Sequence, residues 1–387
     1  MRGRTRATWP RAATLGNSEA MARCPSWTRT IAPVAVMLAS LVASEARADL
    51  RVDATRMTTR DDVVLAPAAD GHLVPLAVDP TFQARVAKLL QASRAPSGAI
   101  VAADARTGRI LAWASHGGSA DLVSTPRFPP ASLTKVVTAA ALLEGEHVFR
   151  PTPQCYGGGV RGLTWDDVRL DCRPGDNEMP FGEALGYSIN VIFGRLARKH
   201  LKDDELARVG TELGFGGRAA IDVEVPESRF DWPEDGLPLA QAAAGFSRKA
   251  KVSPLSVLSM MHTIANGGTR VKLRLVGSDV EREPTGESLK SATANALVRM
   301  LEVTTRRGTS HEAFRPREGR PTYRAAGKTG TLIVGSPARM LSWFGGFAPS
   351  RDPEIVVVVM LANDISWWRK GNQVARDVFD AYFADEK

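Results

Sequence analysis

Apolar residues first recur at helical spacing in the segment 79–93. The residues that recur are Phe82, Val86, Leu89 and Leu90. Pro80 suits the first turn, where a missing N–H costs nothing. The pattern predicts a helix here. The preceding stretch, 49–74, has only short alternating runs, and we assign it as an N-terminal extension.

Runs of β-branched and aromatic residues mark the two ends of the remaining chain. Residues 98–115 form two such runs around the turn Thr107-Gly108, which predicts a hairpin. Near the C-terminus three further runs are separated by turn residues and followed by a helical pattern; they cover 327–335, 340–349 and 353–364, with the helix at 372–383. Strands at both ends predict one sheet assembled from distant segments.

Helical patterns fill most of the chain between these strands. An Ala- and Leu-rich helix is expected to start after Pro130, where Ser132 can cap it. Residues 145–268 read as mostly helical and polar loop, and the further helices are expected at 181–200, 203–214, 252–266 and 291–308. The predicted fold class is therefore α+β, with a mainly helical subdomain inserted into one composite domain.

The first 48 residues have the pattern of a secretory signal peptide. An Arg-rich stretch precedes the apolar run 31–43, and Ala46-Arg47-Ala48 is a small-x-small cleavage site. We expect cleavage after Ala48 and an exported, periplasmic protein, soluble or peripherally associated. A short uncleaved anchor is the alternative, although the run is shorter than the roughly 20 residues of a membrane span. Met21 could equally be the true start.

The composition is that of a globular protein, and the net charge bears on whether nucleic acid is a partner. The chain is 44% hydrophobic and 24% charged, as in an ordinary globular protein. Its formal net charge is +8, but +5 of this lies in residues 1–48, which leaves about +3 on the mature chain. This near balance gives no support for a nucleic-acid partner.

Cysteine and histidine usage indicates a disulfide and no metal. Without the signal peptide, Cys155 and Cys172 remain. In an exported protein such a pair predicts a disulfide, and closing a loop of roughly 15 residues stabilises by about 3 kcal/mol. Two unpaired buried thiols are the alternative. The six histidines are scattered without ligand spacing, so we expect no metal and no cofactor.

The segment AAGKTGTL at 325–332 allows two interpretations. A phosphate-binding loop needs Gly five residues before Gly327, where this chain has Thr322, and a helix after the lysine, where strand-like residues follow. The other interpretation is the edge strand of an acyl-serine enzyme, which requires two serine motifs upstream in a fixed order.

Both serine motifs are present in that order. Ser132 is followed by Lys135, and Ser188 by Asn190, before the segment that begins at Lys328. Ser-x-x-Lys alone carries little information, because it occurs by chance about once in a chain of this length. The ordered set is far more specific, because each member lies in a suitable element. The first is at a helix start, the second in a break between two helical runs, and the third on a strand.

The chemistry of such a site explains the residue types. Ser132 and Lys135 lie on one helix face, and an enclosed lysine beside other cations can be neutral and accept the serine proton. Ser188 would relay that proton toward the leaving amine, and Asn190 would hold the substrate's backbone amide.

The strand at 328–331 would dock the substrate as an added β-strand. Lys328 would offer positive charge to a substrate carboxylate, which the hydroxyls of Thr329 and Thr331 can also bind. Gly330 leaves room for close approach. The backbone N–H groups of Ser132 and Thr331 would form the oxyanion hole.

With these residues in place, the chain resembles the transpeptidase domain of penicillin-binding proteins over residues 75–387. The segments 98–115, 252–268, 308–310 and 343–349 are also similar to stretches of such domains. The resemblance implies a β-lactamase/transpeptidase-like fold with an antiparallel sheet flanked by helices. It implies acylation of Ser132 by the D-Ala-D-Ala end of peptidoglycan stem peptides, transfer to a neighbouring amine, and trapping by β-lactams.

Several features bear on the subtype. No glycosyltransferase segment precedes residue 75, and 49–74 is too short for the pedestal domain of many family members, so other cell-wall synthesis proteins are candidate partners. Asn190 departs from class D β-lactamases, which usually carry Val there. The Glu-x-x-x-Asn element of class A enzymes is missing, so fast β-lactam hydrolysis is not expected. A DD-carboxypeptidase, which uses water as acceptor, and a slowly acylating sensor or scaffold are the alternatives.

The basic stretch SRKAK at 247–251 is the remaining feature. A solvated loop and a contact with an anionic cell-wall component are both consistent with its composition.

Overall fold

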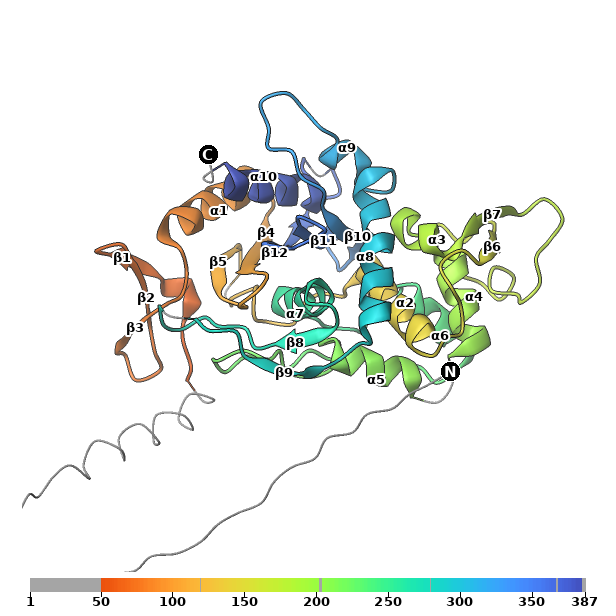
Figure 1. Ribbon diagram of the computed structural model, residues 1–387, viewed down its shortest axis with the longest axis horizontal. Helices are drawn as coiled ribbons and strands as arrows, with labels where there is room; N and C mark the ends of the chain where they lie inside the picture. Colours follow the sequence, from red (N-terminus) through yellow and green to blue (C-terminus); the bar gives the residue numbers. More distant parts are fainter. Residues whose placement is uncertain (1–49, 119, 202–203, 279, 367, 385–387) are drawn as a thin grey trace, which may run out of the picture. The chain divides into compact units, whose positions relative to one another are not determined.

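A five-stranded antiparallel sheet with the strand order β10-β11-β12-β4-β5 forms the centre of the fold (Figure 1). The structure is a computed structural model that describes residues 50–118, 120–201, 204–278, 280–366 and 368–384. The strands are β4 (Ser97–Asp104), β5 (Ile110–His116), β10 (Ala326–Val334), β11 (Arg339–Ala348) and β12 (Ile355–Asn363). The predicted hairpin and the three C-terminal strands are therefore confirmed, within one sheet built from both ends of the chain.

Both faces of this sheet are buried. On β12, Val356 and Val358 pack into one hydrophobic cluster, whereas Val357 and Val359 pack into another, as the alternation of side chains along a strand requires. Two helices cover the second face, α1 (Pro80–Ala92) and α10 (Gly371–Phe383), and two cover the first, α7 (Pro254–Ala265) and α8 (Ser291–Arg306). The predicted α+β class with a flanked antiparallel sheet is confirmed.

A mainly helical region lies beyond α8 (Figure 1). It consists of α2 (Thr134–Glu144), α3 (Phe181–Tyr187), α4 (Asn190–His200), α5 (Glu205–Glu212) and α6 (Gly236–Ala243). The predicted break at the Ser188 motif between two helical runs is confirmed. Ser188 adopts a left-handed conformation with φ 60° and ends α3. Helix α2 begins at Thr134 and not at Ser132, which lies in the preceding 3₁₀ turn η2 (Ala131–Leu133).

Several short elements escape the sequence pattern. Residues 145–268 also contain the hairpin of β6 (Pro153–Tyr156) and β7 (Asn177–Pro180), where only helices and loops are expected. The other short elements are β8 (Thr269–Val271), β9 (Pro284–Glu287), α9 (His311–Phe314), η1 (Ala54–Arg56), β1 (Thr58–Arg60), β2 (Val63–Pro67) and β3 (Leu73–Pro75). Val64 and Ala66 of β2 belong to the same buried cluster as α7 and α8, so part of the predicted extension is packed into the core.

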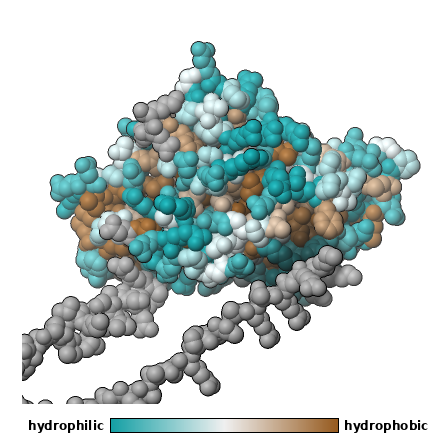
Figure 2. All heavy atoms as spheres, in the orientation of Figure 1, coloured by the Kyte–Doolittle hydropathy of each residue, from teal (hydrophilic) through white to brown (hydrophobic). Residues whose placement is uncertain are grey.

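The surface is mostly hydrophilic on the face shown in Figure 2, with smaller hydrophobic areas between polar ones. Within the described part of the chain, no helix combines the length and apolar character needed to cross a membrane. The predicted signal peptide, 1–48, lies outside the described residues.

Candidate active site

A cleft of 470 Å³ lies where the turn η2, the junction of α3 and α4, and the edge strand β10 meet. Its lining includes Ser132, Ser188, Asn190 and Thr331. These four residues come from three motifs that are separated by more than 50 positions in the sequence. The structure therefore brings all three motifs to one cavity.

The turn that carries Ser132 is held by close backbone packing. Ala131 has φ 51°, a conformation that costs a non-glycine residue energy unless its surroundings impose it. A Cβ atom on Gly245 would lie 2.3 Å from the carbonyl oxygen of Ala131, and one on Gly330 would lie 2.9 Å from that of Pro130. Both positions require glycine, so two neighbouring segments fix the position of the serine.

Lys135 lies directly behind Ser132. Its Nζ is 2.9 Å from Ser132 Oγ and donates to the carbonyl of Ala244 at 2.6 Å. The side chain is completely buried. Burial, followed by the nearby charge of Lys328, lowers the pKa of Lys135 well below its ordinary value. A neutral amine beside a hydroxyl can take its proton, so the pair has the geometry of a base and a nucleophile.

Ser188 and Lys328 form a second pair of the same kind. Lys328 Nζ donates to Ser188 Oγ at 3.0 Å and to the carbonyl of Thr329 at 2.9 Å. This lysine is also completely buried, and burial lowers its pKa to about 7. The left-handed conformation at Ser188 turns its side chain out of the helix and toward β10.

Asn190 is the first residue of α4, and its side chain holds the loop that forms one wall of the cleft. Its amide nitrogen donates to the carbonyls of Gly159 at 2.7 Å and Val160 at 3.2 Å. A disulfide joins Cys155 to Cys172 and closes the loop that contains these carbonyls. Residues 156–160 of the same loop line the cleft. The disulfide loop is therefore part of the site, a connection that the sequence does not reveal.

Thr309 is a neighbour of the site that the predicted residue set lacks. Its hydroxyl lies 2.7 Å from that of Thr329, and its backbone N–H donates to the carbonyl of Gly186 in α3. Thr309 thus links β10 to α3, next to Ser188. Its segment, 308–310, has a recognisable sequence, but its role depends on a contact across 20 positions that no local pattern encodes.

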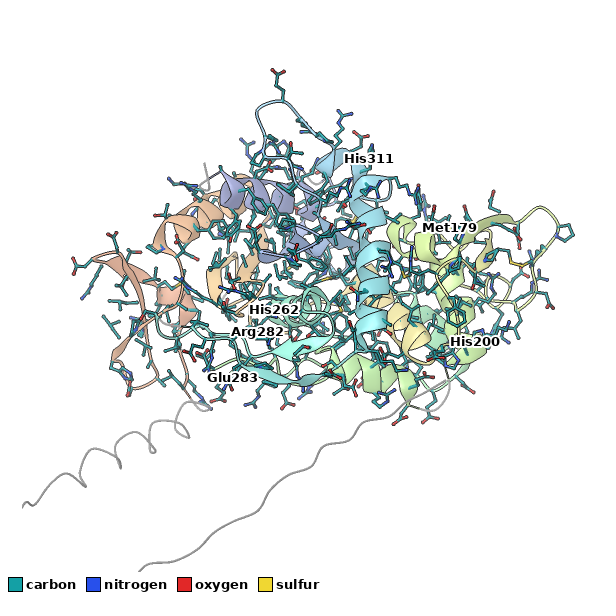
Figure 3. The ribbon with its side chains drawn as sticks, viewed as in Figure 1. Met179, His200, His262, Arg282, Glu283 and His311 are labelled. Carbon is teal, nitrogen blue, oxygen red and sulfur yellow. A yellow bond between two sulfur atoms is a disulfide. The ribbon has the colours of Figure 1, made fainter. Side chains whose placement is uncertain are left out.

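Other features of the molecule lie away from this cleft. A larger cavity of 730 Å³ is lined by residues of α4, α5 and α6 and contains none of the motif residues. His200, His262 and His311 lie on α4, α7 and α9 and do not converge (Figure 3). His262 is buried beside the Asp104 carbonyl, and burial lowers its pKa to about 4. Among the described residues, no group of three or more His, Cys, Asp or Glu side chains could hold a metal ion.

The family model described as the penicillin binding protein transpeptidase domain matches residues 98–383. The chain belongs to this family.

Individual relatives agree with this assignment. The chain is 27% identical to stage V sporulation protein D of Bacillus subtilis, over 81% of its own length and 53% of that protein. It spans about half the length of the curated relatives it matches.

Solved structures show the same fold. The transpeptidase domain of Burkholderia pseudomallei penicillin-binding protein 3 matches with a TM-score of 0.66 at 24% identity, over 81% of this chain and 95% of that one. Penicillin binding protein 3 of Mycobacterium tuberculosis, complexed with ampicillin, matches with a TM-score of 0.64 at 21% identity, over 83% and 80% of the two chains.

Proposed function

We propose that this protein is a peptidoglycan DD-transpeptidase that is acylated on Ser132 by the D-Ala-D-Ala end of stem peptides. The observation that carries the proposal is the distance of 2.9 Å between Ser132 Oγ and the amine of Lys135, in a completely buried position that lowers the pKa of this lysine. Membership of the transpeptidase family supports it.

In the acylation step, Lys135 takes the proton of Ser132 while the serine oxygen attacks the carbonyl carbon of the penultimate D-Ala. The backbone N–H groups of Ser132 and Thr331 hold the resulting oxyanion. When the tetrahedral intermediate collapses, the bond to the terminal D-Ala breaks. Ser188 relays the proton to the leaving amine, and D-Ala departs. An amine of a neighbouring stem then attacks the ester carbonyl and forms the new amide bond as the ester bond breaks. Its proton passes through Lys135 to the departing oxygen of Ser132, which restores the hydroxyl.

Substrate binding uses the open edge of β10. Lys328, with its pKa near 7, gains positive character when a substrate carboxylate approaches, because an opposite charge favours the protonated form. Thr329 and Thr331 complete the carboxylate site. The space expected beside Gly330 is filled by the turn that carries Ser132, so this glycine serves the packing of that turn. The amide nitrogen of Asn190 is engaged by the disulfide loop, which leaves its carbonyl oxygen to accept the N–H of the substrate backbone.

The proposal also includes the domain boundaries, the location of the protein and its inhibition by β-lactams. Residues 1–48 are a signal peptide, 49–74 an extension and 75–387 the transpeptidase domain, which works in the periplasm. β-Lactams form an ester with Ser132. The ampicillin complex of the Mycobacterium tuberculosis relative supports this, as a property of that protein. Other proteins of cell-wall synthesis are its partners in this proposal.

Labelling with a fluorescent penicillin tests the acylation. The purified protein should become covalently labelled, and the adduct should map to Ser132 by mass spectrometry. Ser132→Ala should remain unlabelled while keeping its thermal stability. Labelling of the alanine variant would overturn the assignment of the nucleophile.

Products formed from a pentapeptide donor separate the transpeptidase from the two alternatives. With an added amine acceptor, a transpeptidase gives the cross-linked peptide in addition to released D-Ala. A carboxypeptidase gives only the shortened peptide and D-Ala. A sensor or scaffold gives an acyl adduct that persists and no turnover, and this outcome would contradict the proposed activity.

A further inference from the structure

The basic stretch 247–251 contacts the same edge strand that the substrate is proposed to use. Nη1 of Arg248 donates to the carbonyl oxygen of Ile333 at 2.9 Å. In an antiparallel strand, the N–H and C=O groups of alternate residues face the same side. The carbonyls of Thr329 and Ile333, two residues of this alternating set, each accept a hydrogen bond from a basic side chain. Residues 329, 331 and 333 therefore present their polar backbone groups at the open edge.

Two cations bracket the open edge. Lys328 donates a hydrogen bond to the carbonyl oxygen of Thr329, and Arg248 donates one to that of Ile333. Between them lies Thr331, which lines the cleft beside Ser132. The rise of about 3.4 Å per residue puts Ile333 roughly 7 Å along the strand from Thr331. An added strand thus finds only a short free stretch of edge before it reaches the guanidinium of Arg248.

The direction of the bound peptide relative to β10 follows from where its terminal carboxylate and its reacting carbonyl lie. In the proposed function, the terminal carboxylate of the donor lies at Lys328 and Thr329, and the reacting carbonyl lies at Thr331. The peptide then runs antiparallel to β10, and the residue that precedes D-Ala-D-Ala lies beside Ile333 and Arg248.

The positive charge of Arg248, beside Ile333, is available to a ligand. The side chains of Arg248, Lys249 and Lys251 are exposed, and within the described part of the chain none of them has a carboxylate at ion-pair distance. The only partner of the Arg248 guanidinium there is the Ile333 carbonyl, so most of its N–H groups remain directed at solvent or a ligand. A guanidinium with free donors is suited to bind a carboxylate through two parallel hydrogen bonds.

We propose that Arg248 is a specificity-determining residue that recognises a side-chain carboxylate on the donor residue preceding D-Ala-D-Ala. This inference rests on the proposed transpeptidase function. It names the stem-peptide chemistry that the three motifs leave open: a diamino-acid residue that carries an acid group, such as diaminopimelic acid, is preferred to lysine at this position.

Acylation by two matched donors tests the inference. The donors are peptides ending in diaminopimelyl-D-Ala-D-Ala and lysyl-D-Ala-D-Ala, identical elsewhere, and the readout is kcat/KM for D-Ala release. The wild type should favour the first donor by about fivefold, the range of a solvent-exposed ion pair. Arg248→Gln should remove the preference, mainly by slowing the acidic donor, and Arg248→Lys should restore part of it.

Lys249→Gln is the matched control, because it removes the same charge from the next residue, which has no bond to β10. It should leave the preference in place. If both variants lost the donor preference equally, the preference would come from the overall positive charge of the stretch and not from the contact of Arg248. This result would overturn the inference. Equal rates for both donors on the wild type would also overturn it.

Labelling of Ser132 by penicillin separates this failure from failure of the proposed function. It requires no upstream peptide and should be unchanged in Arg248→Gln. If the wild type takes up penicillin yet does not distinguish the donors, only the Arg248 inference fails. If Ser132 is not labelled at all, the proposed function fails.

Discussion

The start of α2 and the middle of β10 each bury one lysine completely, and each lysine contacts one serine hydroxyl and one backbone carbonyl. The two sites nevertheless differ in charge. Burial alone lowers the pKa of Lys328, to about 7, whereas both burial and the neighbouring charge of Lys328 lower the pKa of Lys135, well below its ordinary value. Repulsion between two buried ammonium groups is relieved when one of them loses its proton, and the charge of Lys328 favours this loss at Lys135.

This difference assigns separate roles to two residues of the same type. Lys135, whose neutral form is favoured by burial and by the charge of Lys328, can act as the base for Ser132. The lysine that titrates near neutrality can become the cation that a substrate carboxylate pairs with.

Lys135→Met should reduce the rate of Ser132 acylation by about a thousandfold, the scale of a lost general base. The methionine fills a similar volume, so the fold should persist. Stopped-flow or quenched labelling with a fluorescent penicillin measures the rate. If Lys135→Met stays within tenfold of the wild type while Lys328→Met does not, the roles are the reverse of those assigned here.

Lys328→Met should reduce acylation by peptide donors with a free terminal carboxylate by about a hundredfold, comparable to the loss of one oxyanion donor. The physical reason is the loss of a cation at the carboxylate and of the hydrogen bond to Ser188. Donors whose terminal carboxylate is methylated provide the control. They should react slowly with the wild type and lose much less on substitution, and an equal loss for both donors would argue against a role in carboxylate binding.

Lys328→Met should also stabilise the folded protein by about 2 kcal/mol at pH 6, because a buried unpaired charge is replaced by an apolar side chain. The folded-state pKa, about 7, lies below the unfolded value, so the folded state binds this proton less tightly. The penalty is therefore full below pH 7 and disappears as the pH rises toward 10.5.

Urea unfolding at pH 6 and pH 9 measures the gain, which should be larger at pH 6. Lys249→Met, at an exposed position, should change little at either pH. A loss of stability in Lys328→Met at pH 6 would show that the hydrogen bonds of Lys328 outweigh its burial penalty.

Thr309→Val should reduce acylation by about fivefold, because one hydrogen bond to Thr329 is lost, and such a bond contributes about 1 kcal/mol. Thr309 is a positioning residue in this account, so the loss should appear in KM for carboxylate-bearing donors more than in kcat. Thr309→Ser retains the hydroxyl and should recover most of the activity. Failure of the serine to rescue would attribute the effect to packing.

The sequence predicts those parts of the fold that depend on local periodicity. The strands at 98–115 and the three C-terminal strands are confirmed because buried strands with turn residues between them have an unambiguous pattern. The hairpin of β6 and β7 escapes detection, because its short polar strands are stabilised by the disulfide and the neighbouring Arg195, which donates to Cys155.

For the candidate site, too, the sequence predicts the residues of the motifs but not their tertiary contacts. Ser132, Ser188 and Lys328 can be nominated from their order in the sequence. The contact between Ser188 and Lys328 cannot, because it depends on a left-handed turn and on two segments 140 residues apart meeting across the cleft. Thr309 and Arg248 escape for the same reason, since their partners on β10 are identified only by tertiary packing.

The pH dependence of Ser132 acylation in the wild type and in Lys328→Met tests the central claim, that neutral Lys135 is the base, most directly. The rate should rise with pH as Lys135 loses its proton. Removing the cation at Lys328 raises the pKa of Lys135, so the acidic limb of the profile should move to higher pH in the variant, whatever its maximal rate. An acidic limb that stays in place, moves to lower pH or disappears in Lys328→Met would contradict the account, because the titrating base would then not be a lysine that senses the charge of Lys328.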